Sequence, residues 1–188
     1  MESVRAFIAI ALPPEICLAL SDCISRIKQH HGDIKWVRTE GLHITLKFLG
    51  DIQPGRVEEI ASSLSQIGSA CPAFEISIEG AGAFPGMQRP RIIWTGIRQG
   101  AEELIRLASQ IDGAMETFGF EPEGRPFKPH ITLGRVRSPK NIRETMEAVK
   151  NQTGIFGTFR ANAIILMQSV LKPTGAEYTP LHQFQIQG

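Results

Sequence analysis

Cysteine is scarce in the sequence, and its few copies are not spaced as metal ligands. The chain has 188 residues, among which only Cys17, Cys23 and Cys71 are cysteines, and no two have the C-x-x-C spacing. The odd count and the spacing argue against a disulfide framework and against a zinc site. We therefore expect a reducing compartment, with the cytoplasm as the default.

The sequence also lacks a charge excess and a long apolar run. Its formal net charge of +1 argues against bulk non-specific binding of nucleic acid but leaves room for recognition of one phosphate or strand end. The short apolar stretch near the N-terminus is broken by Pro13 and Pro14 and has no basic region ahead of it, which favours a strand over a signal peptide. No segment has the length of a membrane span, so no membrane association is expected.

The hydrophobic patterns predict strands and helices along the whole chain. Strands are expected at about 3–12, 34–37, 42–49, 73–78, 91–97, 129–136, 161–170 and 177–186. Helices are expected to begin at Pro13–Pro14, at Pro54, at Ala101 and at Pro139. Glycines and prolines between 80 and 90 predict a loop. Residues 1–188 are expected to form a single domain made of two similar lobes.

One tetrapeptide occurs twice. His43-Ile44-Thr45-Leu46 returns as His130-Ile131-Thr132-Leu133, a little under half the chain length later, and each copy is a predicted strand followed by a proline-started helix. A repeated unit of this kind predicts an α+β protein with a pseudo-two-fold axis. Each of its two lobes would supply one strand to a shared central cleft.

The period of two in a strand decides where the side chains of each copy point. His43, Thr45 and Lys47 are expected on one face of their strand, and Ile44, Leu46 and Phe48 on the other. In the second copy, His130 and Thr132 share one face, and Ile131 and Leu133 share the other. The apolar faces are expected to contact helices, and the axis would bring the four polar motif side chains into one cleft.

Two histidines and two threonines in one cleft suit displacement at phosphorus. Because histidine titrates near neutral pH, one imidazole can accept a proton from water while the other donates one to a leaving oxygen. Thr45 and Thr132 can donate hydrogen bonds to non-bridging phosphate oxygens. Two histidines without a nearby carboxylate or thiolate make a poor metal site, so neither a metal nor another cofactor is expected. A strained cyclic phosphodiester is a better fit than an unstrained one.

The two motifs in their context resemble a known family. HITLKFLG at His43–Gly50 and KPHITLGR at Lys128–Arg135 are similar to the tandem H-x-T-x motifs of the 2H phosphoesterase superfamily. The nearest resemblance is to its RNA 2′,3′-cyclic phosphodiesterase family, also called 2′-5′ RNA ligase-like. The similarity extends over essentially the whole chain and includes Pro90–Trp94.

The resemblance implies a bilobal fold in which antiparallel sheets line a central cleft and helices lie outside. It implies hydrolysis of a terminal RNA 2′,3′-cyclic phosphate to a 2′-phosphate, with His43 protonating the departing 3′ oxygen and His130 activating water. Reversible 2′-5′ ligation, with tRNA fragments as one substrate class, is implied as the reverse reaction. A monomer is expected. The symmetric motifs by themselves do not assign the two histidine roles.

Three further residues are candidates for substrate contacts. The family often has an arginine at the place of Arg135 to hold phosphate; strict alternation would turn Arg135 away from His130, but a bulge at Gly134 would turn it inward. Phe127 and Trp36 are candidates for stacking a base, with a core position as the alternative for Phe127.

Two other functions remain open from the sequence alone. The chain is also compatible with a module that binds a nucleotide or RNA end without turning it over. A third possibility is an enzyme of the same fold that acts on a small molecule such as ADP-ribose 1″,2″-cyclic phosphate.

Overall fold

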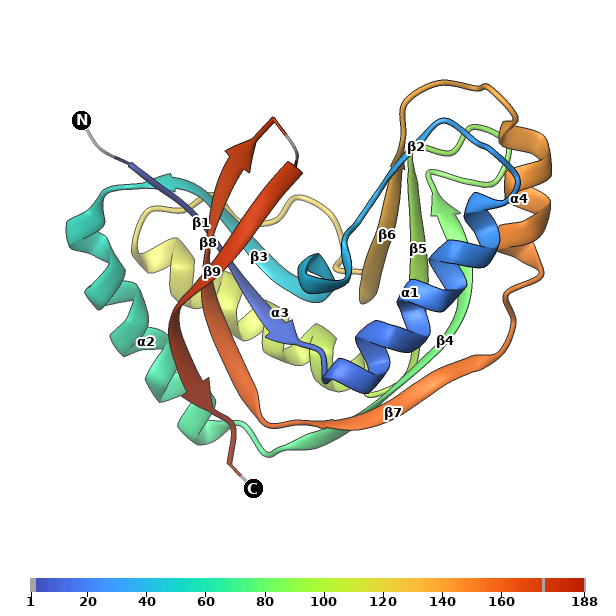
Figure 1. Cartoon of the computed structure of the whole chain (residues 1–188). Coiled ribbons are helices and arrows are strands. Elements are labelled where there is room, and N and C mark those ends of the chain that lie inside the picture. Colours follow the sequence, from blue (N-terminus) through green and yellow to red (C-terminus); the bar gives the residue numbers. More distant parts are fainter. Residues whose placement is uncertain (1–2, 174, 188) are drawn as a thin grey trace.

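A computed structural model describes residues 3–173 and 175–187 of the chain as an α+β protein (Figure 1). The strands are β1 (Val4–Ala11), β2 (Ile34–Trp36), β3 (His43–Ile52), β4 (Phe74–Phe84), β5 (Ile92–Gln99), β6 (His130–Val136), β7 (Ile155–Ala161), β8 (Ala163–Lys172) and β9 (Gly175–Gln185). The helices are α1 (Pro14–Lys28), α2 (Val57–Ala70), α3 (Ala101–Thr117) and α4 (Ile142–Lys150), with short 3₁₀ turns η1 (Thr39–Gly41) and η2 (Pro54–Arg56). None of the helices in these ranges is long and apolar enough to cross a membrane.

The nine strands of the described ranges join into one curled sheet. Their order is β7-β4-β5-β6-β3-β1-β8-β9, with β2 added beside β6, and the neighbouring strands pair antiparallel. The two motif strands β3 and β6 meet at the centre, where Ile44 pairs with Ile131. We call β3, β1, β8 and β9 the first lobe and β6, β5, β4 and β7 the second lobe. The predicted bilobal α+β fold is confirmed, and Figure 1 shows the lobes opening away from each other above their junction.

The helix that follows β1 and the helix that follows β5 each cross to the opposite lobe. Helix α1 follows β1 but packs on β7 and α4 of the second lobe, whereas α3 follows β5 and packs on β3 and α2. In β7, Gly157 has a φ of 149°, which L side chains rarely adopt, and a Cβ atom there would lie 2.3 Å from Cδ1 of Ile16 in α1, so glycine suits this close approach. The exchange interlocks the two lobes.

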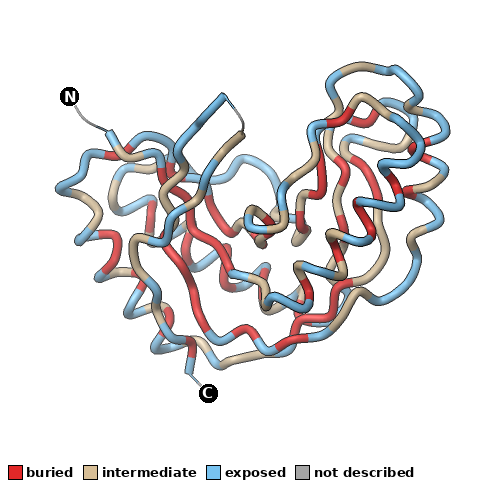
Figure 2. The backbone as a smooth tube through the Cα atoms, viewed as in Figure 1, coloured by how far each residue is buried: buried red, intermediate tan, exposed pale blue. Residues whose placement is uncertain are grey.

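The hydrophobic core fills the space between the sheet and the helices. Ile8, Ile44, Ile93 and Ile131 on the four central strands are fully buried. Figure 2 shows buried residues along the strands and on the inner sides of the helices, while the turn tips are exposed. The apolar stripes of both motifs are therefore buried, as their alternation predicts.

Two predictions about the second lobe were wrong. Strand β4 continues through Gly80 and Gly82, where a loop was predicted, because the backbone at Gly82 leaves room for the ring of Trp94. A Cβ atom there would lie 2.5 Å from that ring. Strand β7 was not predicted at all, since it lies at the edge of the sheet and only Phe159 and Ala161 in it are buried.

The prediction that Lys47 shares the polar face of β3 was also wrong. Between β1 and β3 the register shifts: Ala9 pairs with Thr45, but Ile8 pairs with Lys47, so Leu46 is an extra residue. Such a β-bulge reverses the alternation beyond it. Lys47 is consequently buried at 3% exposure, and Phe48 is 62% exposed.

Lys47 instead ties β3 to α3 and to the loop that precedes β6. Its Nζ donates to Asp112 Oδ1 at 2.5 Å and to the Glu121 carbonyl at 3.0 Å, and the Glu123 amide donates to Asp112. Burial tends to raise the pKa of Asp112, but these hydrogen bonds outweigh it and hold that pKa below its usual value.

We expect Lys47→Met to lower the free energy of unfolding by about 2–3 kcal/mol, because it leaves Asp112 partly buried without its cation. Urea denaturation followed by circular dichroism would measure the change, with the exposed Lys35→Met as the matched control. Equal midpoints for the two variants would show that the buried pair contributes no net stability.

Candidate active site

The central strand junction brings the two motifs side by side. His43 and His130 are the first residues of β3 and β6. Because these strands run antiparallel through the pair Ile44–Ile131, His43 lies beside Thr132, and Thr45 lies beside His130. The structure therefore brings together the four motif residues that the sequence predicts to share a cleft.

Both imidazoles are held by the same kind of hydrogen bond, to a backbone carbonyl. Nδ1 of His43 lies 2.8 Å from the Gly41 carbonyl, and Nδ1 of His130 lies 2.7 Å from the Lys128 carbonyl. A carbonyl only accepts, so Nδ1 must carry the proton in both rings. Nε2 is then the basic nitrogen of a neutral ring and the acidic N–H of a charged ring. Each ring is ready for either role in proton transfer.

The surroundings favour the neutral form of both rings. Burial lowers the pKa of His43, the Gly41 carbonyl raises it in part, and the charge of His130 lowers it further. Burial also lowers the pKa of His130, which the Lys128 carbonyl opposes and the nearby Arg135 reinforces. The mutual effect of the rings means that they titrate as a coupled pair.

Aromatic rings that the sequence analysis did not single out surround the histidines. Phe7 and Tyr178 lie 4.8 and 5.1 Å from the ring of His43, measured between centroids. Phe84 makes an edge contact with His130 at 5.1 Å. Tyr178 is the single tyrosine of the chain, but it lies on β9 at the sheet edge, and no spacing rule connects it to either motif.

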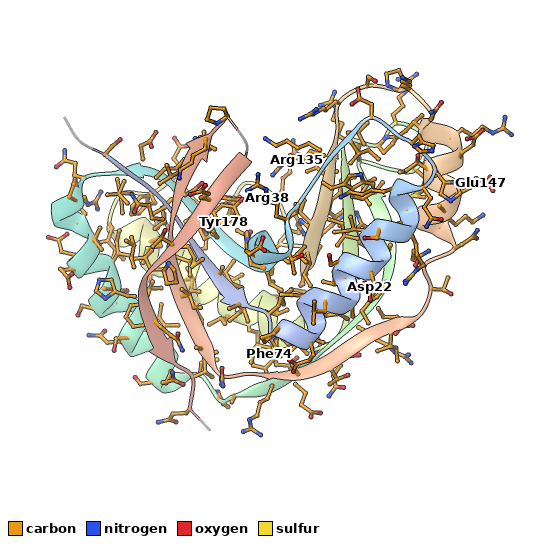
Figure 3. All side chains as sticks on the ribbon, in the orientation of Figure 1. Asp22, Arg38, Phe74, Arg135, Glu147 and Tyr178 are labelled. Carbon is orange, nitrogen blue, oxygen red and sulfur yellow. The ribbon has the colours of Figure 1, made fainter. Side chains whose placement is uncertain are left out.

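A second bulge turns Arg135 toward the site. Ile93 pairs with Gly134 while Trp94 pairs with Thr132, so Leu133 is an extra residue in β6. Arg135 thereby shares the face of His130, where its charge acts on that ring. Figure 3 shows Arg135, Arg38 and Tyr178 around the space between the lobes. Arg38 was not singled out from the sequence.

The two residues proposed to stack on a base lie on different elements. Trp36 pairs with Gly134, and a Cβ atom on that glycine would lie 2.9 Å from the Trp36 ring. The indole shares its face of β2 with the buried Ile34 and packs against the core. Phe127 is half-buried in the loop before β6, where it also contacts the core. Both stacking roles stay predictions.

The chemistry available is proton transfer on two sides of one bound group. Within residues 3–173 and 175–187, no three histidine, cysteine or acidic side chains form a group that could hold a metal ion. The two Nε2 atoms, two hydroxyls and Arg135 match an acid, a base and donors for a phosphate. Fold and site thus define the class of two-histidine phosphoesterases.

The family follows from comparison with known proteins. The model of the LigT-like phosphoesterase family matches the chain twice, over residues 10–94 and 96–178, and the chain belongs to this family. The two matches also confirm the internal repeat that the tetrapeptide indicates.

Relatives and solved structures match this chain over nearly its full length. The chain is 35% identical to an RNA 2′,3′-cyclic phosphodiesterase of Methanothermobacter thermautotrophicus, over 97% of this chain and 99% of that one. It is 33% identical to one of Aquifex aeolicus over the whole of both chains. Among structures, TT0787 of Thermus thermophilus superposes with a TM-score of 0.81 at 28% identity, covering 98% of both chains. E. coli LigT in complex with 3′-AMP superposes with a TM-score of 0.79 at 25% identity and full coverage.

We expect the pKa of both histidines in the free protein to lie below that of an exposed imidazole, because burial opposes their charged forms. Nitrogen-15 NMR of the imidazoles would measure this and would show the proton of the neutral rings on Nδ1. Arg135→Gln should raise the pKa of His130, since it removes a repelling charge. Neutral rings protonated on Nε2 would contradict the assignment of the carbonyl bonds.

Proposed function

We propose that the protein hydrolyses terminal RNA 2′,3′-cyclic phosphates to 2′-phosphates by acid–base catalysis between His43 and His130. Membership of the LigT-like family supports this, as do the full-length relatives named RNA 2′,3′-cyclic phosphodiesterase. The observation that carries the proposal is the matched pair of Nδ1–carbonyl bonds at the strand junction. These bonds leave two Nε2 atoms available in one site.

In the proposed hydrolysis, each proton that is released is taken up by one of the two histidines, and each proton that is needed is supplied by one. Water attacks phosphorus while Nε2 of His130 takes its proton, and the bond from phosphorus to the 3′ oxygen breaks. Nε2 of His43 donates its proton to that oxygen, which becomes the free 3′ hydroxyl. Thr45, Thr132 and Arg135 donate hydrogen bonds to the non-bridging oxygens, where negative charge increases in the transition state.

The same site also suits the reverse reaction and a defined class of partner. A 3′ fragment that supplies a hydroxyl in place of water would be joined through a 2′-5′ linkage, with tRNA fragments as one candidate substrate. The crystal complex of E. coli LigT with 3′-AMP supports nucleotide binding at this fold. We further propose that residues 1–188 act as one domain, since one continuous sheet contains both motifs. We also propose that the protein is a cytoplasmic monomer.

We expect an oligonucleotide ending in a 2′,3′-cyclic phosphate to be converted to the 2′-phosphate in the presence of EDTA. Phosphorus NMR would identify the product. His43→Ala and His130→Ala should each lower kcat by about 10²–10⁴-fold, the usual contribution of one acid or base. A rate that disappears on chelation and returns with a divalent ion would refute the metal-free mechanism.

Two controls separate the other functions. A binding module would retain the oligonucleotide in a filter-binding assay but show no turnover that His130→Ala could remove. An enzyme for small molecules would hydrolyse ADP-ribose 1″,2″-cyclic phosphate in preference to the oligonucleotide when the two compete.

The pH–rate profile should be bell-shaped, because one ring must be neutral and the other charged. On the acid side kcat/KM falls as the base becomes protonated, and on the alkaline side it falls as the acid loses its proton. Since burial lowers both pKa values from the ordinary value of an imidazole, the maximum of kcat/KM should be shifted toward acid pH. The maximum of kcat should lie higher, because a bound phosphate favours the charged ring. A profile that is flat from about pH 5 to 8 would contradict two-histidine catalysis.

A further inference from the structure

The carbonyl that holds His43 belongs to an ordered turn. Gly41 lies at the end of η1, and its amide donates to the Arg38 carbonyl at 2.9 Å. The hydroxyl of Thr39 in the same turn donates to the hydroxyl of Ser21 in α1 at 3.1 Å. Hydrogen bonds within the turn, and one to the neighbouring helix, therefore keep this carbonyl in place.

The carbonyl that holds His130 lies in a connection without regular structure. Residues 120–129, which lead from α3 to β6 (Figure 1), form neither helix nor strand, and most of them are exposed. Three of these residues are prolines, which have no amide to donate to a backbone partner. The carbonyl of Lys128, which accepts from His130, therefore depends on contacts that the connection makes with other elements.

The ion pair of Lys47 and Asp112 supplies two such contacts. Nζ of Lys47 donates to the Glu121 carbonyl at 3.0 Å, and the Glu123 amide donates to Asp112 Oδ2 at 3.1 Å. Nζ also lies 2.5 Å from Asp112 Oδ1, so the two contacts reinforce each other. Because Lys47 comes from β3, the strand of the first motif holds the connection that leads to the second histidine.

The backbone between these contacts and Lys128 has little freedom. Arg125 and Lys128 each precede a proline, which favours extended backbone, and each proline has a fixed φ. Residues 125–129 therefore form a stiff segment, joined at Gly124 to the part that the ion pair holds. Phe127 packs against the core near the other end of this segment. Release of the first end would let the segment tilt about Phe127 and would move the Lys128 carbonyl.

We propose that Lys47 and Asp112 are positioning residues for His130, an inference that rests on the proposed function. They hold the connection so that the Lys128 carbonyl accepts the Nδ1 proton of the ring, which leaves Nε2 to exchange protons in the reaction. The first motif strand thus carries His43 and also supports the histidine of the second motif.

The relation between the two motif strands is not reciprocal. Gly134 follows the extra residue of β6 as Lys47 follows that of β3, and glycine has no side chain with which to support the other histidine. The turn that holds His43 has its own hydrogen bonds instead. Loss of the ion pair should therefore affect His130 selectively.

The test determines which nitrogen carries the proton in each neutral ring. Nitrogen-15 NMR at a pH above both titrations excludes any mutual charge effect, because neither ring is then charged. In Lys47→Met and in Asp112→Ala, we expect His130 to lose part of its Nδ1–H form while His43 keeps it. The pKa of His130 should also fall, since the Lys128 carbonyl raises it. Because Lys47 shares a strand with His43, damage that merely spreads from Lys47→Met would reach His43 first.

The kinetic readout is hydrolysis of adenosine 2′,3′-cyclic phosphate. Both variants should lower kcat by roughly 10- to 100-fold, because a misplaced ring transfers protons poorly, while KM should stay near its wild-type value. Asp112→Asn should retain most of kcat and the Nδ1–H form of His130. Oδ1 of Asp112 lies 2.5 Å from Nζ of Lys47 and 3.2 Å from the Glu123 nitrogen, so one amide oxygen can accept both hydrogen bonds.

A matched control separates positioning from lost stability. Val149→Ala removes buried methyl groups from α4, which packs on α1 and β4, and it should leave both ring tautomers and kcat unchanged. If it reproduces the loss at His130, general loosening explains the effect and the proposal is overturned. An equal change in His43 and His130 overturns it for the same reason.

Three further results would also decide against the proposal. One is an unaltered His130 tautomer in both Lys47→Met and Asp112→Ala, and another is a wild-type kcat in both. The third is Asp112→Asn that behaves like Asp112→Ala, which would assign the effect to the lost charge. If the wild-type protein does not hydrolyse the cyclic phosphate, the proposed function fails, and the NMR comparison alone then decides whether the ion pair positions His130.

Discussion

The site depends on one contact, the antiparallel pairing of β3 with β6 at Ile44 and Ile131. This pair lies on the pseudo-two-fold axis, so each histidine lies beside the threonine of the other motif. The buried isoleucines fix the register because a slip by one residue would turn His43 or His130 into the core and an isoleucine toward the site. Packing therefore determines the geometry of the polar groups, and α1 and α3, exchanged between the lobes, cover the core side of the sheet.

The repeat places identical bulges in both lobes, yet the residues after them differ. Leu46 and Leu133 are the extra residues, and the next side chain is Lys47 in one lobe and Gly134 in the other. Lys47 extends to α3, whereas Gly134 leaves room for Ile34 and Trp36, since a Cβ atom would lie within 2.9 Å of both. One position further, Phe48 and Arg135 turn back toward the site. The two motif strands thus have a similar backbone conformation, but the side chains after their bulges make different contacts.

The sequence was sufficient for the elements whose pattern is local. Alternation predicted the faces of His43, Thr45, His130 and Thr132, and paired prolines predicted the start of α1. Prediction from the sequence failed where a contact with a residue further along the chain determines the structure. Gly82, for example, belongs to a strand because Trp94 covers it. The bulge that buries Lys47 depends on pairing with β1, whereas the matching bulge was foreseen as an option because Gly134 signals it. The contact of Tyr178 with His43 depends on β9, a strand that comes near His43 only because it pairs with β8 in the sheet.

An axis that relates the histidines also creates a chemical difficulty, because the reaction that they serve has no such symmetry. Both rings have their proton on Nδ1, both are destabilised in the charged form by burial, and both lie beside a threonine. Nothing in these contacts distinguishes acid from base. The distinction must come from groups outside the motifs. Arg135 is one such group, because its charge opposes a charge on His130 and so favours this ring as the neutral base.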